Sequence, residues 1–251
     1  MEIKEYEVMY DIEEDYWWYI GLRKLVLSYL NGTKSDDRKL KILDAGCGTG
    51  KLLEDCNSYG AYGLDFSEEA LRFCKLRNLK NMLRASISHI PFKDDSFDLV
   101  TSFDVICCLD VHYDMVILKE LYRITNKNGI LLLNLPAYNF LQSTHDRAVH
   151  IKHRYFMSEV KRKVEKAGFV IERITYRNTF LFPIAFTVRV LKKMLTTDMD
   201  KSKSDLQPLP RFLNKILTYT LLLENKLIVS GVSFPFGLSI FCVARKKLQK
   251  I

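Results

Sequence analysis

The glycine-rich stretch over residues 42–50 constrains this chain more than any other feature. An apolar run over residues 40–43 leads into it and is typical of a buried parallel strand. Gly46, Gly48 and Gly50 then alternate with other residues before a helix-forming run. Glycines permit positive φ and a close approach of a ligand to the backbone, and a helix start adds free N–H groups and a positive dipole end. The stretch predicts a strand–loop–helix unit that binds a nucleotide-like ligand.

Three classes of ligand compete for such a loop. A phosphate-binding P-loop needs GxxxxGK followed by Ser or Thr, but here Leu52 follows Lys51 and Ala45 stands at the first glycine position. The dinucleotide fingerprint is GxGxxG, and here the third glycine comes one residue early. Asp44 precedes the loop and can attract a cationic group of a ligand. The pattern therefore excludes a P-loop and departs from the dinucleotide fingerprint.

Asp65 is the second part of the nucleotide-binding pattern. It ends a strand-like run over residues 61–65, about twenty residues after the first glycine, where an acid can accept both ribose hydroxyls. The alternative role is a helix cap, because Ser67-Glu68-Glu69 follows and favours a helix N-terminus. Position and spacing together favour the ribose role.

A second motif lies over residues 88–100, where Pro91-Phe92-Lys93-Asp94-Asp95-Ser96-Phe97-Asp98 precedes an apolar strand. This motif and Leu43-Asp44-Ala45-Gly46-Cys47-Gly48-Thr49-Gly50 resemble the signatures of class I S-adenosylmethionine (SAM)-dependent methyltransferases. Residues 143–155 are similar to the type 11 group of that family, which carries Ser-x-His-Asp, then His and Arg-Tyr. The resemblance implies an α/β fold with a Rossmann-like seven-stranded sheet of order 3-2-1-4-5-7-6, its last strand antiparallel and helices on both faces.

The resemblance also implies roles for individual residues. Contacts to SAM are expected from Arg23, Asp44, Gly46, Cys47, Gly48, Gly50, Asp65, Phe66, Ser86, Ile87, Phe103 and Asp104. Arg23 follows the aromatic cluster over residues 16–19 and is expected to reach the SAM carboxylate, whereas Ile87 is expected to stack on adenine. Substrate contacts are expected from Tyr138, His150, Arg154 and Tyr155.

His145 and Asp146 are the predicted catalytic pair. A hydroxyl acceptor must lose a proton to a base, and histidine, with an unperturbed pKa of about 6.5, can take it when a carboxylate orients the ring. A structural loop in which both side chains bond the backbone is the alternative. His145, Asp146, His150 and His153 could also bind a metal by residue type. Their spacing matches neither HExxH nor a zinc finger, so we expect no metal.

The chain is expected to form one domain over residues 1–251. An N-terminal helical cap is expected over residues 1–35, a roof over the substrate pocket at 136–156, and an apolar helical insertion before the last strand at 178–230. The aromatic cluster of the cap either docks its helix on the main domain or forms a lid over the cofactor.

Charge and cysteine content bear on partners and compartment. The net charge of +8 can attract nucleic acid or an anionic membrane, but no basic and aromatic platform favours nucleic acid. The six cysteines show no CxxC pair, and the acidic start of the chain lacks a signal peptide, so we expect a cytoplasmic protein. Basic residues flank the apolar runs of the 178–230 insertion: Arg189, Lys192, Lys193, Arg211 and Lys215. They favour peripheral contact with a membrane, while packing of both helices against the sheet is the alternative.

The predicted function is SAM-dependent methylation, at oxygen, of a small-molecule or lipid-linked acceptor with deprotonation by histidine. Two other functions stay open: a nicotinamide-dependent oxidoreductase on a similar sheet, and a SAM-binding protein without catalysis. Neither the acceptor nor the oligomeric state follows from the sequence.

Overall fold

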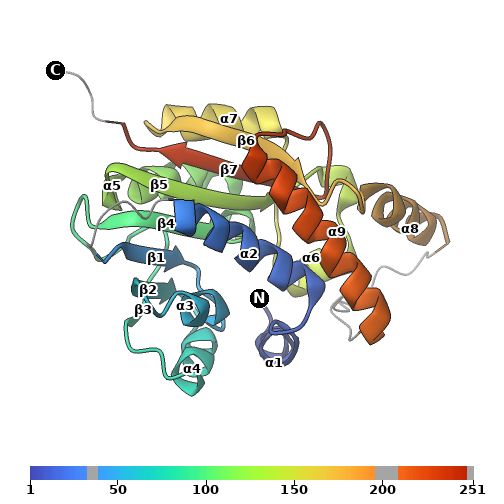
Figure 1. The fold of residues 1–251 in the computed structure, drawn as a ribbon, viewed down its shortest axis with the longest axis horizontal. Coiled ribbons are helices and arrows are strands. Elements are labelled where there is room, and N and C mark those ends of the chain that lie inside the picture. The colour runs from blue at the N-terminus through green and yellow to red at the C-terminus, as the bar shows by residue number, and fades with distance from the viewer. Residues whose placement is uncertain (33–38, 196–208, 248–251) are drawn as a thin grey trace.

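A seven-stranded mixed sheet forms the centre of the molecule (Figure 1). The computed structural model describes residues 1–32, 39–195 and 209–247. In spatial order the strands are β3 (Met82–Arg84), β2 (Gly60–Asp65), β1 (Lys41–Ala45), β4 (Phe97–Phe103), β5 (Thr125–Pro136), β7 (Ser239–Arg245) and β6 (Val170–Arg177). β7 runs antiparallel to β5 and β6, and the other neighbouring pairs are parallel. The predicted order 3-2-1-4-5-7-6 with a reversed last strand is confirmed.

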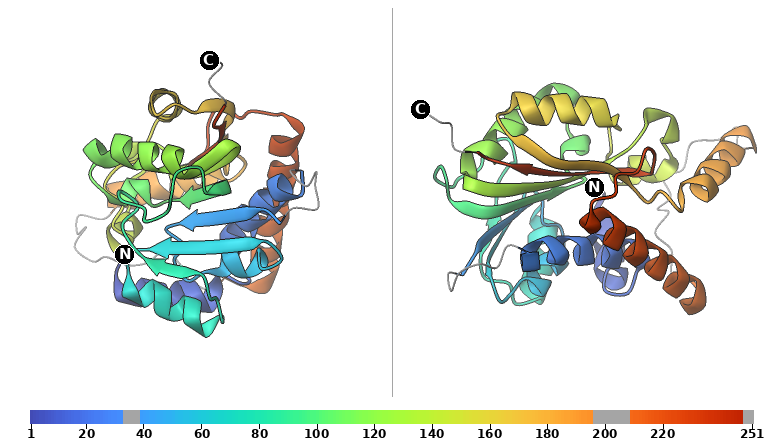
Figure 2. Two further views of the ribbon diagram at one scale, coloured as in Figure 1. Left: turned by 90° about the vertical axis from the view of Figure 1, so that its left-hand side faces the viewer. Right: turned by 45° about the horizontal axis from the view of Figure 1, so that its top comes forward.

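Helices cover both faces of the sheet (Figure 2). The helices are α1 (Ile3–Ile12), α2 (Trp17–Gly32), α3 (Lys51–Asp55), α4 (Glu68–Leu76), α5 (Asp114–Ile124), α6 (Thr144–Ala148), α7 (Met157–Lys166), α8 (Phe182–Leu195) and α9 (Arg211–Ser230). Short 3₁₀ turns occupy Ile106–Cys108, Val111–Tyr113 and Asn139–Leu141. α5 and α7 pack on one face and α2 with α9 on the other, so the central strands are buried on both sides.

Local sequence explains several of these elements. The Ser67 hydroxyl accepts the N–H of Ala70 and caps α4, as expected of a helix N-terminus. Val160 and Val164 share the buried face of α7, at a spacing of four residues. β5 begins at Thr125, directly after α5. Asn128 adopts a positive φ of 64° within this strand.

The segments that approach the carboxyl edge of the sheet come from both ends of the chain. The N-terminal stretch folds as α1 and α2, with α1 packed on α4 through Tyr6 and Phe73. α8 and the first half of α9 project beyond this edge (Figures 1 and 2). Residues 33–35 of the predicted cap and 196–208 of the predicted insertion lie outside the described residues. Within the described ranges, every helix is too short or too polar to cross a bilayer.

Candidate active site

A cavity of about 2000 Å³ lies at the carboxyl edge of β1, β2, β4 and β5. Open α/β sheets bind ligands at this edge, outside the carboxyl ends of the strands. Asp44, Asp65 and Asp104 each stand at the end of a different strand and line the cavity. The same cavity extends past Pro136 to the helices α8 and α9, so it has a glycine-loop half and an apolar half.

The glycine loop forms one wall of the cavity, and each of its three glycines has different neighbours. Gly46 has a φ of 92°, and a Cβ there would lie 2.1 Å from a methyl carbon of Val105. Gly48 has a φ of 53° and lies beneath Met9 of α1. Gly50 faces Leu79 and Cys74 rather than the cavity, so it permits close packing of the loop on the α4 region. Gly46 and Gly48 are therefore the glycines that a ligand would meet.

Asp65 connects the loop to the end of β2. One carboxylate oxygen accepts the backbone N–H of Gly48 at 2.9 Å, and the other accepts the N–H of Ser67 at 2.9 Å. Burial raises the pKa of Asp65 above its ordinary value, and these backbone N–H groups oppose the shift. Asp65 thus braces the loop and also faces the cavity, where the predicted ribose contact would be made.

Asp44 is buried and Asp104 is half-buried, and each carboxyl group has few compensating contacts. The Thr101 hydroxyl donates to Asp44 at 2.7 Å, and burial raises the pKa of Asp44 to about 7. The side-chain amide of Asn134 donates to both oxygens of Asp104 at 3.1 Å, and burial again raises the pKa to about 7. Groups that titrate near neutral pH in a cavity are typical of functional sites.

Four further residues predicted to contact SAM lie at the same cavity. Ser86, Ile87, Phe66 and Phe103 all line the cavity. Ile87 is buried, whereas Phe66 is 73% exposed and forms part of the rim. The Ser86 hydroxyl lies 2.8 Å from that of Ser88. The structure brings the predicted SAM-contacting residues to one cavity, with Gly50 as the exception.

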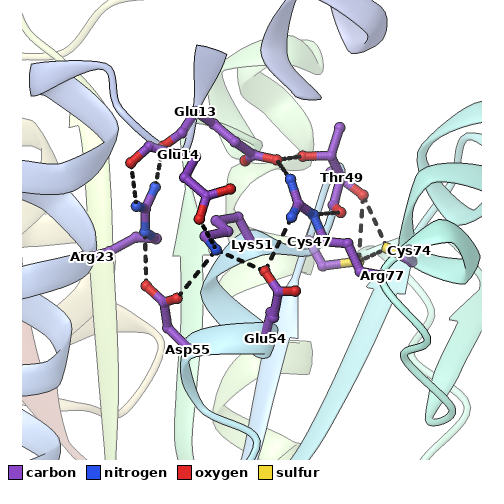
Figure 3. Close-up of polar contacts among 11 residues, drawn as sticks. Glu13, Glu14, Arg23, Cys47, Thr49, Lys51, Glu54, Asp55, Cys74 and Arg77 are labelled. Carbon is purple, nitrogen blue, oxygen red and sulfur yellow. Dashed lines mark hydrogen bonds and ion pairs between the residues drawn. The ribbon is translucent and has the colours of Figure 1, made fainter. Parts of the chain in front are cut away.

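A polar network holds the end of α1 over the loop (Figure 3). The buried carboxylate of Glu13 accepts the Thr49 hydroxyl and, at 2.8 Å, a guanidinium N–H of Arg77. Arg23 lines the cavity but donates to Asp55 at 2.9 Å and to the carbonyl of Glu13. Its guanidinium joins α2 to α3, so the predicted contact with the SAM carboxylate stays a prediction.

The sequence did not predict α1 as a cavity wall. Tyr6, Met9 and Glu13 line the cavity, together with Trp17 and Trp18 of the predicted aromatic cluster. The N–H of Glu2 donates to the carbonyl of Ala148 in the predicted roof, at 3.1 Å. The spacing of Ile3, Tyr6 and Tyr10 is helical and was the available signal.

The predicted roof contains a buried ion pair. Arg154 donates to the two carboxylate oxygens of Asp146 at 2.6 and 2.7 Å, and both residues are less than 5% exposed. Arg154 also donates to the carbonyl of Ala137 at 3.1 Å, while Asp146 accepts the N–H of Ser143 at the start of α6. Both oxygens of Asp146 are therefore bonded to Arg154, and its predicted role in orienting His145 stays a prediction. His145 lines the cavity, and its role as a base stays a prediction.

Two predicted substrate contacts point away from the cavity. Tyr155 is buried in the core below the roof, and its hydroxyl donates to Asp114 at 3.0 Å. Tyr138 stacks on Tyr176, with ring centroids 5.1 Å apart, among other aromatic rings. Neither residue lines the cavity; the burial of Tyr155 contradicts its assignment, whereas the assignment of the half-buried Tyr138 stays a prediction. Alternation explains Tyr155: its neighbour Arg154 faces the cavity side of an extended segment that pairs with Ala137.

His150 is at the cavity rim and contacts the start of the chain. Its Nδ1 accepts the N-terminal ammonium of Met1 at 3.0 Å, and its Nε2 donates to Glu2 at 2.9 Å. His153 instead contacts Glu159 at 3.2 Å. Across residues 1–32, 39–195 and 209–247 no group of three His, Cys, Asp or Glu side chains could hold a metal ion.

The cavity also contains a polar group that the sequence did not predict. Asn178 follows β6 with a positive φ of 60°, is 1% exposed and lines the cavity. Neither atom of its side-chain amide has a hydrogen-bond partner among the described residues. The carboxylate of Glu224 from α9 accepts the backbone N–H groups of Asn178 and Thr179. This contact spans 46 residues, and no local pattern could have predicted it.

The sheet order and the glycine loop beside Asp65 define a class I methyltransferase fold. The family model described as a methyltransferase domain matches residues 43–133. The chain is 34% identical over 127 residues to malonyl-[acyl-carrier protein] O-methyltransferase of Hamiltonella defensa, covering 49% of this chain and 46% of the relative. It is 37% identical over 124 residues to demethylmenaquinone methyltransferase of Geobacillus stearothermophilus, covering 45% and 50%.

The chain spans about half the length of these curated relatives. Among solved structures, a SAM-dependent methyltransferase from Thermotoga maritima superposes with a TM-score of 0.59 at 18% identity, covering 98% of this chain and 96% of the other. At 18% sequence identity, this structural similarity is evidence for the fold alone.

Proposed function

We propose that this protein transfers a methyl group from SAM to an oxygen of a small-molecule or lipid-linked acceptor. The main observation behind this proposal is that one cavity joins the glycine loop and Asp65 to an apolar chamber between α8 and α9. The relatives whose names include an O-methyltransferase and a demethylmenaquinone methyltransferase support acceptors of this kind.

The residues of the glycine-loop half fit SAM. Gly46 and Gly48 line the cavity and allow the positive φ values of the loop, and Asp65 offers a carboxylate to paired ribose hydroxyls. Asp44 lies where a carboxylate can attract the cationic end of the ligand. When bound there, SAM supplies a methyl group on a sulfonium, which is electrophilic and leaves a neutral thioether after transfer.

Two side chains on the cavity wall can take the proton of an acceptor hydroxyl. His145 is the base predicted from the sequence, and Asp104 is the base that the strand end and its pKa favour. Either group would accept the proton that the acceptor hydroxyl loses.

The experiment has two arms. Calorimetry compares the binding of SAM, S-adenosylhomocysteine and NAD⁺; preferential binding of NAD⁺ would support an oxidoreductase and contradict the proposal. SAM labelled at its methyl group is then incubated with the protein and either an organic or an aqueous cell extract. Label is expected in an extracted molecule; SAM binding without transfer into either extract would indicate a binding protein without catalysis.

A further inference from the structure

α9 carries an apolar stripe on the side that faces away from the protein. Phe212, Ile216, Tyr219 and Leu223 recur at intervals of four, three and four residues and therefore share one helix face. Phe212 is 77% and Tyr219 71% exposed, and the other two are also exposed. The opposite face is buried against α2 and the sheet, for example through Ile228. The packing of α9 thus leaves four large apolar side chains in water.

The charges of α9 identify the partner that fits this stripe. The charged residues on the surface of α9 are all basic: Arg211, Lys215 and Lys226. Its one acidic residue, Glu224, is buried and accepts backbone N–H groups. Apolar side chains bordered by basic ones match the boundary of an anionic bilayer, whereas two copies of α9 placed face to face would bring like charges together.

The apolar half of the cavity reaches the surface at α8. Ile184 and Val188 of α8 line the cavity and are also exposed, at 67% and 46%. Leu217 of α9 also lines the cavity, from the helix face turned away from the stripe. α8 and the first half of α9 project from the same end of the molecule (Figure 2). The side chains of residues 189–195 lie outside the described ones, so the predicted flanks Arg189, Lys192 and Lys193 carry no part of this inference.

We propose that α9 lies on an anionic lipid bilayer through Phe212, Ile216, Tyr219 and Leu223, and that an apolar acceptor enters the cavity from the lipid between α8 and α9. The proposed membrane docking follows from the exposed side chains and charges of α9. Only the entry of an acceptor from the lipid rests on the proposed function. Lys215 and Lys226 border the stripe on one side and contact lipid headgroups. Each basic residue near such a surface contributes about fivefold to partitioning.

Vesicle flotation tests the docking. The protein is mixed at low salt with vesicles of phosphatidylcholine alone or with one third phosphatidylglycerol, and bound protein is measured. We expect binding to the anionic vesicles, weak binding to phosphatidylcholine, and loss of binding in high salt. F212S/Y219S should lower partitioning at least tenfold, and K215E/K226E should abolish the preference for anionic lipid.

Matched controls sit on other surfaces. K161E/K166E makes the same charge change on α7, and Leu76→Ser removes an exposed apolar side chain of α4; both should float like the wild type. Thermal unfolding checks that each variant folds.

The docking is wrong if the wild type stays unbound, or if the stripe variants float like the controls. It is also wrong if light scattering shows a dimer that F212S/Y219S dissociates, because a second copy then covers the stripe. SAM affinity, measured by calorimetry without vesicles, tests the proposed function separately.

Discussion

The carboxylate of Asp65 accepts the backbone N–H of Gly48 at 2.9 Å, so the acid at the end of β2 is bonded to the middle of the glycine loop. Ligand contact and loop geometry are therefore coupled through one side chain. A change at Asp65 alters both, and its effects separate only when an isosteric variant is compared with a truncated one.

Asp65→Ala should lower SAM affinity by about ten- to a hundredfold, because a hydrogen bond to a charged group contributes about 1.5–3 kcal/mol. Asp65→Asn keeps an oxygen for the Gly48 N–H and should lose less. Calorimetry measures both. Unchanged affinity in Asp65→Ala would remove this residue from the binding site.

Asp44→Asn should stabilise the SAM-free protein at pH 8 but not at pH 4. Burial raises the pKa of Asp44 from its ordinary value to about 7, so the folded protein binds more protons than the unfolded chain between these values. The contribution of Asp44 to the free energy of unfolding is highest at low pH, where its buried carboxyl group is neutral. It falls as the pH rises through about 7 and this group ionises. Asparagine does not ionise and still accepts the Thr101 hydroxyl.

Thermal unfolding at the two pH values checks this expectation, and each kcal/mol should shift Tm by about 2–4 °C. The same variant should bind SAM more weakly, because it lacks the negative charge. A variant that is equally destabilised at both pH values would show that ionisation of Asp44 is not the cause.

His145→Ala and Asp104→Asn should distinguish the two candidate bases. Loss of the general base lowers turnover by about 10²–10⁴-fold, while SAM affinity stays within a few fold. The pH dependence of turnover is a second measurement. When the catalytic base is removed, the plot of turnover against pH should no longer show the ionisation of that group. If His145→Ala folds and turns over at the normal rate, its role is structural.

Glu224→Ala should destabilise the fold by about 3–5 kcal/mol, because it leaves Arg177 as an uncompensated buried charge and frees backbone N–H groups. Arg177 is 0% exposed, its guanidinium has no hydrogen-bond partner among the described residues, and the Glu224 charge raises its pKa against the lowering by burial. Arg177→Met in the Glu224→Ala background should recover part of the loss. Denaturant unfolding of the four proteins gives the coupling energy, which should be near zero if the two charges act independently.

Glu13→Ala should speed the release of SAM by about tenfold or more, since it removes the acceptor shared by Thr49 and Arg77. Glu14→Ala is the matched control, because Glu14 is largely exposed and its carboxylate accepts from Lys51 at 3.2 Å. Stopped-flow dissociation and hydrogen exchange over residues 3–12 report the opening of α1. Equal rates in both variants would show that the network does not hold the cap closed.

The parts of the fold that sequence predicted well are local. The loop over residues 42–50 and α4 with its Ser67 cap each depend on neighbours in the chain, and both lie where expected. The order of the strands is not local, and its prediction depended on the family resemblance.

The failures in the site have physical causes. Asp146 and Arg154 were assigned separate functional roles, but they pair with each other because the roof folds back on itself. Tyr155 was placed in the pocket, and a one-residue alternation turns it into the core. Asn178 was missed because Glu224, 46 residues away, positions its backbone.

Glu224 and the backbone groups that it holds, at Asn178, Thr179 and Phe180, all lie within residues 178–230. The family match, in contrast, ends at residue 133. The proposed acceptor half of the cavity therefore has an anchor formed within residues 178–230, outside the family match, although α9 also packs on α2 and the sheet. Replacing residues 178–230 with the equivalent segment of a relative should transplant acceptor choice, while the cofactor half keeps its affinity.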